Sequence, residues 1–137
     1  MPLVRIDHPA ILTATEAAAI SQAVHVALIQ VFGVPADDLF QVVARRAPGE
    51  MVVSPQYLGI RHSDLAVFVQ IACSPGRSVG LKEELYARIA AGVAAGTRVP
   101  ADDVIINLVE TVRDNWSFGA GIAHYAVRDR ARPASAS

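Results

Sequence analysis

The sequence predicts an α/β (α+β) fold made of a tandem β-α-β repeat, with a four-stranded core sheet and two helices on one of its faces. Two observations predict this repeat. Residues 34–38 (Val-Pro-Ala-Asp-Asp) recur 65 residues later as residues 99–103. At the same offset, the β-rich residues 3–6 match residues 68–71, and each copy of the motif runs into a further apolar stretch. Agreement of the flanking patterns indicates an internal repeat.

The first half of the repeat, residues 2–46, has the order strand, helix, strand. Its predicted elements are a strand at residues 3–7, a helix at residues 17–32 and a strand at residues 39–45. Thr13 and Thr15 are candidate N-caps, and Glu16 follows Thr13 at the spacing of a capping box. Apolar side chains recur at steps of three and four along the helix, and Gly33 ends it.

The second half, residues 65–112, repeats this order. Its predicted elements are a strand within residues 63–72, a helix at residues 79–95 and a strand at residues 103–109. Ser78 is the candidate N-cap of this helix, and Gly96 ends it. Other segments are predicted as a connecting loop with a short hairpin at 47–62, a small strand or hairpin at 119–127, and a disordered tail at 129–137. Residues 1–128 are expected to form one domain.

The predicted sheet leaves one face without helices. Each strand-helix-strand unit, if its strands pair in parallel, takes a right-handed crossover, and this places both helices on one side. Residues 67–72 are nearly continuous in apolar side chains, as in sheets that are buried on both sides. We therefore expect the bare face to pack against another subunit in an oligomer.

Composition excludes several classes of protein. Hydrophobic residues make up 53% of the 137 residues and charged residues 18%, which excludes a disordered polar chain. Twelve basic against thirteen acidic residues give a net charge of −1, so nucleic acid is not an expected partner. The apolar runs look short of the ~20 residues of a membrane helix, and no signal peptide is evident, so we expect a cytoplasmic protein without a membrane partner. The single cysteine, Cys73, excludes a disulfide framework.

Pro2 is the first candidate for chemistry. Removal of Met1 would turn its nitrogen into a secondary amine, which can act as a general base, a general acid, or a nucleophile toward a carbonyl. The alternative is that Met-Pro is a common start without chemical meaning. Arg77, in the loop before the second helix, could bind a carboxylate, or be a solvated loop arginine. If the first and third strands run antiparallel, Pro2 and Arg77 lie at the same edge of the sheet.

Three further side chains are candidates. Asp38 could accept a proton or orient water, although its repeat partner Asp103 suggests ordinary turn chemistry. Trp116 and Phe118 could wall an apolar pocket, or pack in the core or an interface. The four histidines show no metal-ligand spacing, and we interpret His25 as a packed or interfacial histidine.

Taken in order, several segments resemble the tautomerase superfamily, and within it the malonate semialdehyde decarboxylase-like branch. They are residues 1–7 (Met-Pro-Leu-Val-Arg-Ile-Asp), 32–38 (Phe-Gly-Val-Pro-Ala-Asp-Asp), 48–52 (Pro-Gly-Glu-Met-Val) and 116–119 (Trp-Ser-Phe-Gly). The resemblance spans about residues 2–127. It implies a double β-α-β unit that forms trimers and a catalytic amino-terminal proline that needs no cofactor.

Carried over to this sequence, the resemblance implies that Pro2 is catalytic, that Asp38 acts beside it, and that Trp116 and Phe118 form a hydrophobic wall. The branch decarboxylase carries Arg-Pro-Arg where this chain has Ser-Pro-Gly-Arg at residues 74–77, so one of its two arginines is missing. We therefore expect a keto-enol tautomerase that acts on a small oxo acid held by Arg77. The alternatives are a decarboxylase (a lyase) or hydratase, and a non-catalytic homotrimer.

Overall fold

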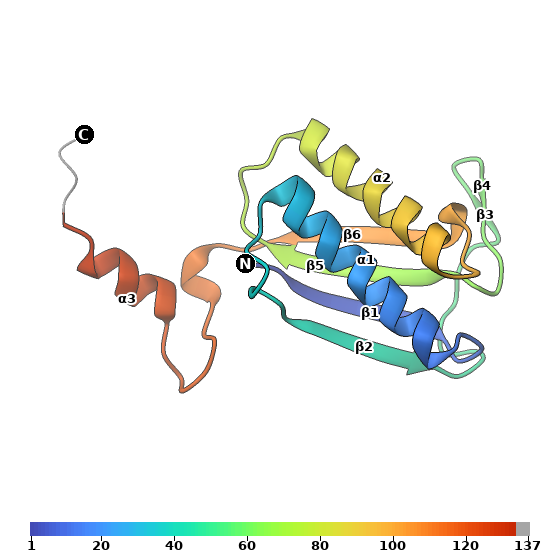
Figure 1. Cartoon of the computed structure of the whole chain (residues 1–137), viewed down its shortest axis with the longest axis horizontal. Helices are drawn as coiled ribbons and strands as arrows, with labels where there is room; N and C mark the ends of the chain where they lie inside the picture. The colour runs from blue at the N-terminus through green and yellow to red at the C-terminus, as the bar shows by residue number, and fades with distance from the viewer. Residues whose placement is uncertain (134–137) are drawn as a thin grey trace.

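Two β-α-β units form the body of the computed structural model, which describes residues 1–133 (Figure 1). The first unit consists of β1 (Leu3–Pro9), α1 (Ala14–Phe32) and β2 (Gln41–Arg46). The second consists of β5 (Val67–Cys73), α2 (Val79–Gly96) and β6 (Val104–Glu110). A hairpin of β3 (Gln56–Tyr57) and β4 (Ile60–Arg61) lies between them, and α3 (His124–Ala131) follows. The predicted order of elements is therefore confirmed for both units.

The four long strands form one sheet in the order β2-β1-β5-β6. Strands β1 and β2 pair in parallel, as do β5 and β6, whereas the central pair β1 and β5 is antiparallel. The two units also share one register: Val4 pairs with Gln41, and 65 residues later Val69 pairs with Ile106. The repeat read from the sequence is thus a repeat of hydrogen-bond register as well.

Both helices pack on the same face of the sheet and against each other (Figure 1). Helix α1 begins at Ala14, three residues earlier than predicted, because Thr13 and Glu16 form a complete capping box; Thr15 lies inside the helix and is not a cap. Gly33 ends α1 in the left-handed conformation, with φ at 68°. Ser78 caps α2 by accepting a hydrogen bond from the backbone N–H of Leu81, as predicted.

The core lies between the helices and the sheet. Its fully buried side chains are apolar and come from β1, α1, β5 and α2: Val4, Ile6, Ile20, Val24, Leu28, Val67, Val69, Ile71, Leu85, Ile89 and Val93. By length and composition alone α1 could cross a membrane, contrary to our estimate from its apolar runs. Because its buried residues pack into this core, the fold uses α1 as a core helix.

Within residues 1–133, no helix lies over the opposite face of the sheet (Figure 1). Along β1 the side chains alternate between buried and accessible, so that Val4 and Ile6 face the helices and Arg5 faces away. Arg5 pairs with Gln70, and Gln70 donates a hydrogen bond to Asn107 over 3.1 Å. A row of polar groups therefore crosses a face that was expected to be apolar.

The segment after β6 differs most from prediction. Residues 119–127 were expected to form a strand or hairpin, but residues 119–121 turn with positive φ angles and α3 begins at His124. Arg113 holds this helix through two hydrogen bonds to the carboxylate of Asp129. Helix α3 therefore extends three residues into the predicted tail; residues 134–137 of that tail lie outside the described residues.

Candidate active site

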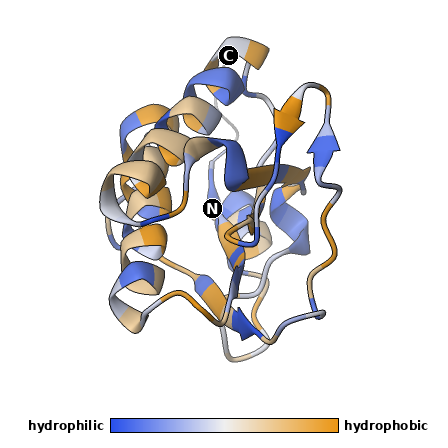
Figure 2. Cartoon of the chain, turned by 90° about the vertical axis from the view of Figure 1, so that its right-hand side faces the viewer, coloured by the Kyte–Doolittle hydropathy of each residue, from blue (hydrophilic) through white to orange (hydrophobic). Residues whose placement is uncertain are grey.

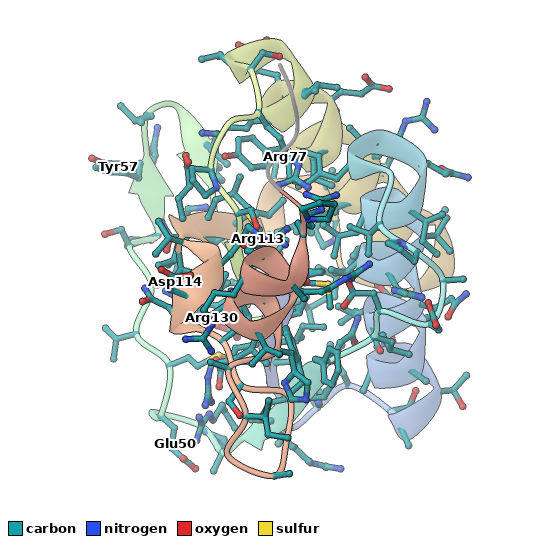
Figure 3. The ribbon with its side chains drawn as sticks, turned by 90° about the vertical axis from the view of Figure 1, so that its left-hand side faces the viewer. Glu50, Tyr57, Arg77, Arg113, Asp114 and Arg130 are labelled. Carbon is teal, nitrogen blue, oxygen red and sulfur yellow. The ribbon has the colours of Figure 1, made fainter. Side chains whose placement is uncertain are left out.

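One end of the sheet gathers the candidate residues of the first strand and the third (β5). Because β1 and β5 are antiparallel, with Leu3 opposite Ala72, the start of β1 lies beside the end of β5. Pro2 is buried there, next to Cys73 and the loop that leads to α2. Figure 3 looks onto this end of the molecule, with α3 in front and Arg77 and Arg113 labelled. The shared edge expected for Pro2 and Arg77 is therefore present.

The loop before α2 directs the side chain of Arg77. Gly76 has φ of +110°, a conformation that residues with a Cβ rarely adopt, so glycine sets the direction of the chain at this point. The Arg77 guanidinium lies over the ring of Phe32, 4.2 Å from its centroid, and donates one hydrogen bond to the carbonyl of Ser74. Among residues 1–133 Arg77 has no carboxylate partner, which leaves its remaining donors for an anion.

Asp38 lies at the same end, in the loop before β2. Its residue is only 6% exposed, and within the described residues its Oδ1 is buried without a hydrogen-bond partner. Burial raises the pKa of the Asp38 carboxyl; the amino-terminal charge lowers that pKa, Asp37 raises it, and His25 lowers it. A buried carboxyl group with one oxygen that meets no donor in the described part of the chain can take part in proton transfer near the amino terminus.

Aromatic side chains cover this end of the sheet. Trp116 and Phe118 stack with their ring centroids 5.3 Å apart, and Phe118 also contacts Phe40 at 5.5 Å and the edge of Tyr125 at 5.4 Å. His124 completes the cluster through its Nδ1, which accepts a hydrogen bond from the N–H of Phe118. The two predicted aromatics therefore belong to a larger aromatic cluster.

Tyr125 and Phe40 were missed by the sequence analysis. Tyr125 was hidden because residues 119–127 were read as a strand, whereas α3 turns this side chain onto Phe118. Burial raises the pKa of the Tyr125 hydroxyl, and the charge of Asp38 raises it further. Arg113 lies over the Tyr125 ring at 4.3 Å. For Phe40 a signal was available, since it follows Asp38 by two residues.

A cavity lies at the other end of the sheet, the end that is turned toward the viewer in Figure 2. Its volume is about 510 Å³, and its lining includes Pro9, Ile11, Arg46, His62 and Asp64. Arg46 is neutralised there by Asp7 at 2.7 Å. By the offset of 65, the positions of Pro2 and Arg77 are occupied at this end by Val67 and Leu12, both buried and apolar. The cavity therefore lacks the groups that gather at the opposite end.

Within residues 1–133 no three His, Cys, Asp or Glu side chains are grouped to hold a metal ion. Cys73 is buried beside the site, and burial raises the pKa of its thiol. A thiol whose pKa is raised is a poor nucleophile at neutral pH.

Comparison with known proteins adds to this geometry. The family model for tautomerase enzymes matches residues 38–119. The curated protein "Probable tautomerase YusQ" of Bacillus subtilis (strain 168) is 31% identical over 104 residues, which cover 76% of this chain and 82% of that protein. Each of these two matches covers more than half of the chain.

Several solved structures are also similar to this chain over most of its length. FG41 malonate semialdehyde decarboxylase, inhibited by 3-bromopropiolate, is 32% identical with a TM-score of 0.86, covering 96% of this chain and 99% of that one. A malonate semialdehyde decarboxylase with decarboxylase and hydratase activities is 33% identical with a TM-score of 0.84, covering 93% and 98%. A fused 4-OT protein solved as a symmetric trimer shares the fold at 20% identity, with a TM-score of 0.75 and coverage of 91% and 98%.

Proposed function

The chain belongs to the tautomerase family, and on that premise we propose that it is a keto-enol tautomerase of a small oxo acid that works through Pro2. Its relatives indicate that the chain is an enzyme of the tautomerase, decarboxylase or hydratase type. The observation that supports the proposal is that two groups lie at one end of the sheet: a buried Asp38 carboxyl, whose Oδ1 has no hydrogen-bond partner among residues 1–133, and the guanidinium of Arg77, which has donors left for an anion.

In the proposed mechanism Met1 is removed, and the amine of Pro2 moves the proton. Arg77 binds the substrate carboxylate through its free N–H groups and fixes the oxo acid at the edge of the sheet. In the enol-to-keto direction the protonated amine gives its proton to the carbon next to the enol carbon. The enol O–H gives its proton through a water to the Asp38 carboxylate, which then returns a proton to the amine. The stacked rings of Trp116 and Phe118 exclude bulk water, which strengthens these interactions.

Decarboxylation or hydration of malonate semialdehyde is the second candidate. It is favoured by the identity of 32–33% to two malonate semialdehyde decarboxylases over almost the whole chain. Against it stands the loop at residues 74–77, in which Arg77 is the only arginine to bind a carboxylate. A single guanidinium suffices to hold a carboxylate that stays on the substrate, as tautomerisation requires.

We also propose that the chain works as a homotrimer. The sheet face opposite the helices is uncovered, and a neighbour of the same fold is a symmetric trimer (Figure 1). Sedimentation equilibrium of the full chain is expected to give three times the chain mass. A monomer at micromolar concentration would contradict this proposal. Cytoplasmic localisation and the absence of a cofactor stay predictions.

The decisive experiment measures intact mass first and activity second. We expect mass spectrometry to find Met1 removed, and ketonisation of the enol of phenylpyruvate to fall about 10²–10⁴-fold in Pro2→Ala. Arg77→Ala is expected to raise KM for the same substrate by about tenfold or more. Malonate semialdehyde loss is assayed in parallel to separate the two candidates. Full activity of Pro2→Ala, or a retained Met1 in an active enzyme, would disprove the proline mechanism. Turnover of neither substrate by the wild-type chain would instead favour the non-catalytic trimer.

A further inference from the structure

His25 has a specific contact beneath the loop that carries Asp38. The residue lies on α1, is only 8% exposed, and places its ring Nε2 3.0 Å from the carbonyl oxygen of Ala36. A carbonyl oxygen only accepts hydrogen bonds, so Nε2 carries a proton and donates it to Ala36. A buried histidine with one defined donor bond fixes the backbone that it contacts.

The contact lies close to Asp38 along the chain. Ala36 precedes Asp38 by two residues, and the N–H of Asp38 donates to the carbonyl of Pro35 over 3.0 Å. Among the described residues, no donor reaches the buried Oδ1 of Asp38. The direction of this carboxylate is therefore set through the backbone of residues 35–38, and His25 is the side chain that holds this backbone from below.

The second unit holds its corresponding carboxylate in place by different contacts. Its corresponding helix position is Ala90, which has no side-chain donor, and its carboxylate belongs to Asp103. Asp103 is fixed directly: it accepts the N–H of Ser63 over 2.7 Å and the Ser63 hydroxyl as well. One unit thus fixes the carboxylate itself, and the other fixes the loop and leaves the carboxylate free.

We propose that His25 is a positioning residue, which holds the carbonyl of Ala36 so that the carboxylate of Asp38 faces the start of β1, where Pro2 lies. This inference rests on the proposed function of Pro2 and Asp38. His25 touches no substrate; it acts through residues 36–38. Its loss lets the loop relax and the carboxylate turn away from Pro2, which lowers the rate of the proton transfer and leaves binding at Arg77 intact.

The test compares His25→Gln with His25→Asn and His25→Leu. The amide nitrogen of glutamine can reach the position of Nε2 and donate, whereas asparagine is too short and leucine has no donor. We expect kcat for phenylpyruvate enol ketonisation to fall about 10-fold or more in His25→Asn and His25→Leu with KM within twofold, and to recover to within about threefold in His25→Gln. Equal loss in the glutamine and asparagine variants, or full activity in His25→Leu, would overturn the proposal.

A matched control comes from the other unit. Ser63→Ala removes the support of Asp103 at the far end of the sheet, so it loosens an equivalent turn without touching the site. We expect it to lower stability and leave kcat unchanged. If kcat of Ser63→Ala fell as far as that of His25→Leu, loosening either turn would be enough to lower the rate. That result would also overturn the positioning role of His25.

A second readout does not depend on activity. Amide hydrogen exchange of Asp38 in the full chain, followed by NMR, is expected to be at least about tenfold faster in His25→Asn than in wild type or His25→Gln. Unchanged protection in His25→Asn would refute the proposal. If Pro2→Ala proves as active as wild type, the proposed function fails, and the exchange rates alone then decide whether His25 positions the loop.

Discussion

Asp38 and Asp103 end the same five-residue motif, in the same place of two units that share one register. Asp103 is 1% exposed and accepts two hydrogen bonds from Ser63. Asp38 is 6% exposed, and its Oδ1 has no partner among residues 1–133. Identical local sequence therefore gives one carboxylate a structural bond and leaves the other unsatisfied. What separates them is the segment that enters the neighbouring strand.

Those two entering segments differ in the groups that they bring. Strand β5 is entered by a loop that carries Ser63, whose hydroxyl and N–H both face Asp103. Strand β1 is entered by Met1 and Pro2, and the amino-terminal charge acts on Asp38 without a direct bond. An unsatisfied buried group costs free energy, so its persistence in one unit alone marks the end where chemistry is expected.

The largest expected difference is in activity. Asp38→Asn is expected to lower kcat/KM for enol ketonisation by about 10²-fold or more, since an amide cannot take up the proton. Asp103→Asn at the equivalent position is expected to retain kcat/KM within about twofold, per folded enzyme. Steady-state kinetics of the two variants, with circular dichroism to verify folding, makes the comparison. Similar losses in both would show that the two carboxylates are not functionally distinct.

Stability is expected to change in the opposite order. Asp103→Ala removes two hydrogen bonds and leaves the N–H and hydroxyl of Ser63 without their acceptor, which costs about 1–3 kcal/mol of unfolding free energy. Urea unfolding at fixed protein concentration measures this, because an oligomer gains stability with concentration. The double variant Asp103→Ala with Ser63→Ala is expected to cost less than the two single losses added together. Simple additivity would argue against the contact.

Asp38→Asn is expected to stabilise the fold near neutral pH, by an amount on the order of 1 kcal/mol. Burial raises the pKa of Asp38 above its ordinary value, so the unfolded chain releases this proton first as the pH rises. The folded state is then penalised progressively as the pH rises from about 3.8 through the raised pKa. The advantage of the variant should accordingly vanish in acid and reach a plateau at neutral pH. Urea unfolding at several pH values tests this. A difference in unfolding free energy between the variant and wild type that does not change with pH would contradict it.

The two helix N-caps offer the smallest contrast. Thr13→Ala breaks a capping box whose Glu16 also binds Arg98, whereas Ser78→Ala removes one bond to the N–H of Leu81. We expect costs of about 1 kcal/mol or more for Thr13→Ala and about 0.5–1 kcal/mol for Ser78→Ala. Thermal unfolding monitored by circular dichroism gives the order, and the reverse order would show that the box adds nothing to the cap.

The fold was predictable from the sequence because local signals and the repeat agree. The 65-residue offset, the cap at Thr13, the cap at Ser78 and the stop at Gly33 each specify a boundary through short-range chemistry. Helix α3 was not predictable in this way. It is fixed by the pair of Arg113 with Asp129 and by aromatic packing, contacts that depend on how residues 119–121 turn.

Most residues of the candidate site could be predicted from the sequence, but the difference in hydrogen bonding between Asp38 and Asp103 could not. Antiparallel pairing of β1 and β5 follows from the topology, so the common edge of Pro2 and Arg77 could be expected. The motif at residues 34–38 suggested ordinary turn chemistry for both aspartates, because sequence does not state which carboxylate finds a donor. The donor of Asp103 is 40 residues away, at Ser63, and only the fold brings the two together.

The loop that joins the two units removes a symmetry that separate chains would impose on the sheet. An assembly of two separate, identical β-α-β chains repeats every residue at both ends of its sheet, so a substitution that frees a carboxylate at one end frees it at the other. A single tethered chain escapes that rule. It keeps Val67, Leu12 and the bonded Asp103 at one end and places Pro2, Arg77 and Asp38 at the other. Duplication within one chain thus allows the stabilising hydrogen bonds of Asp103 at one end to offset the free-energy cost of the unsatisfied Asp38 at the other.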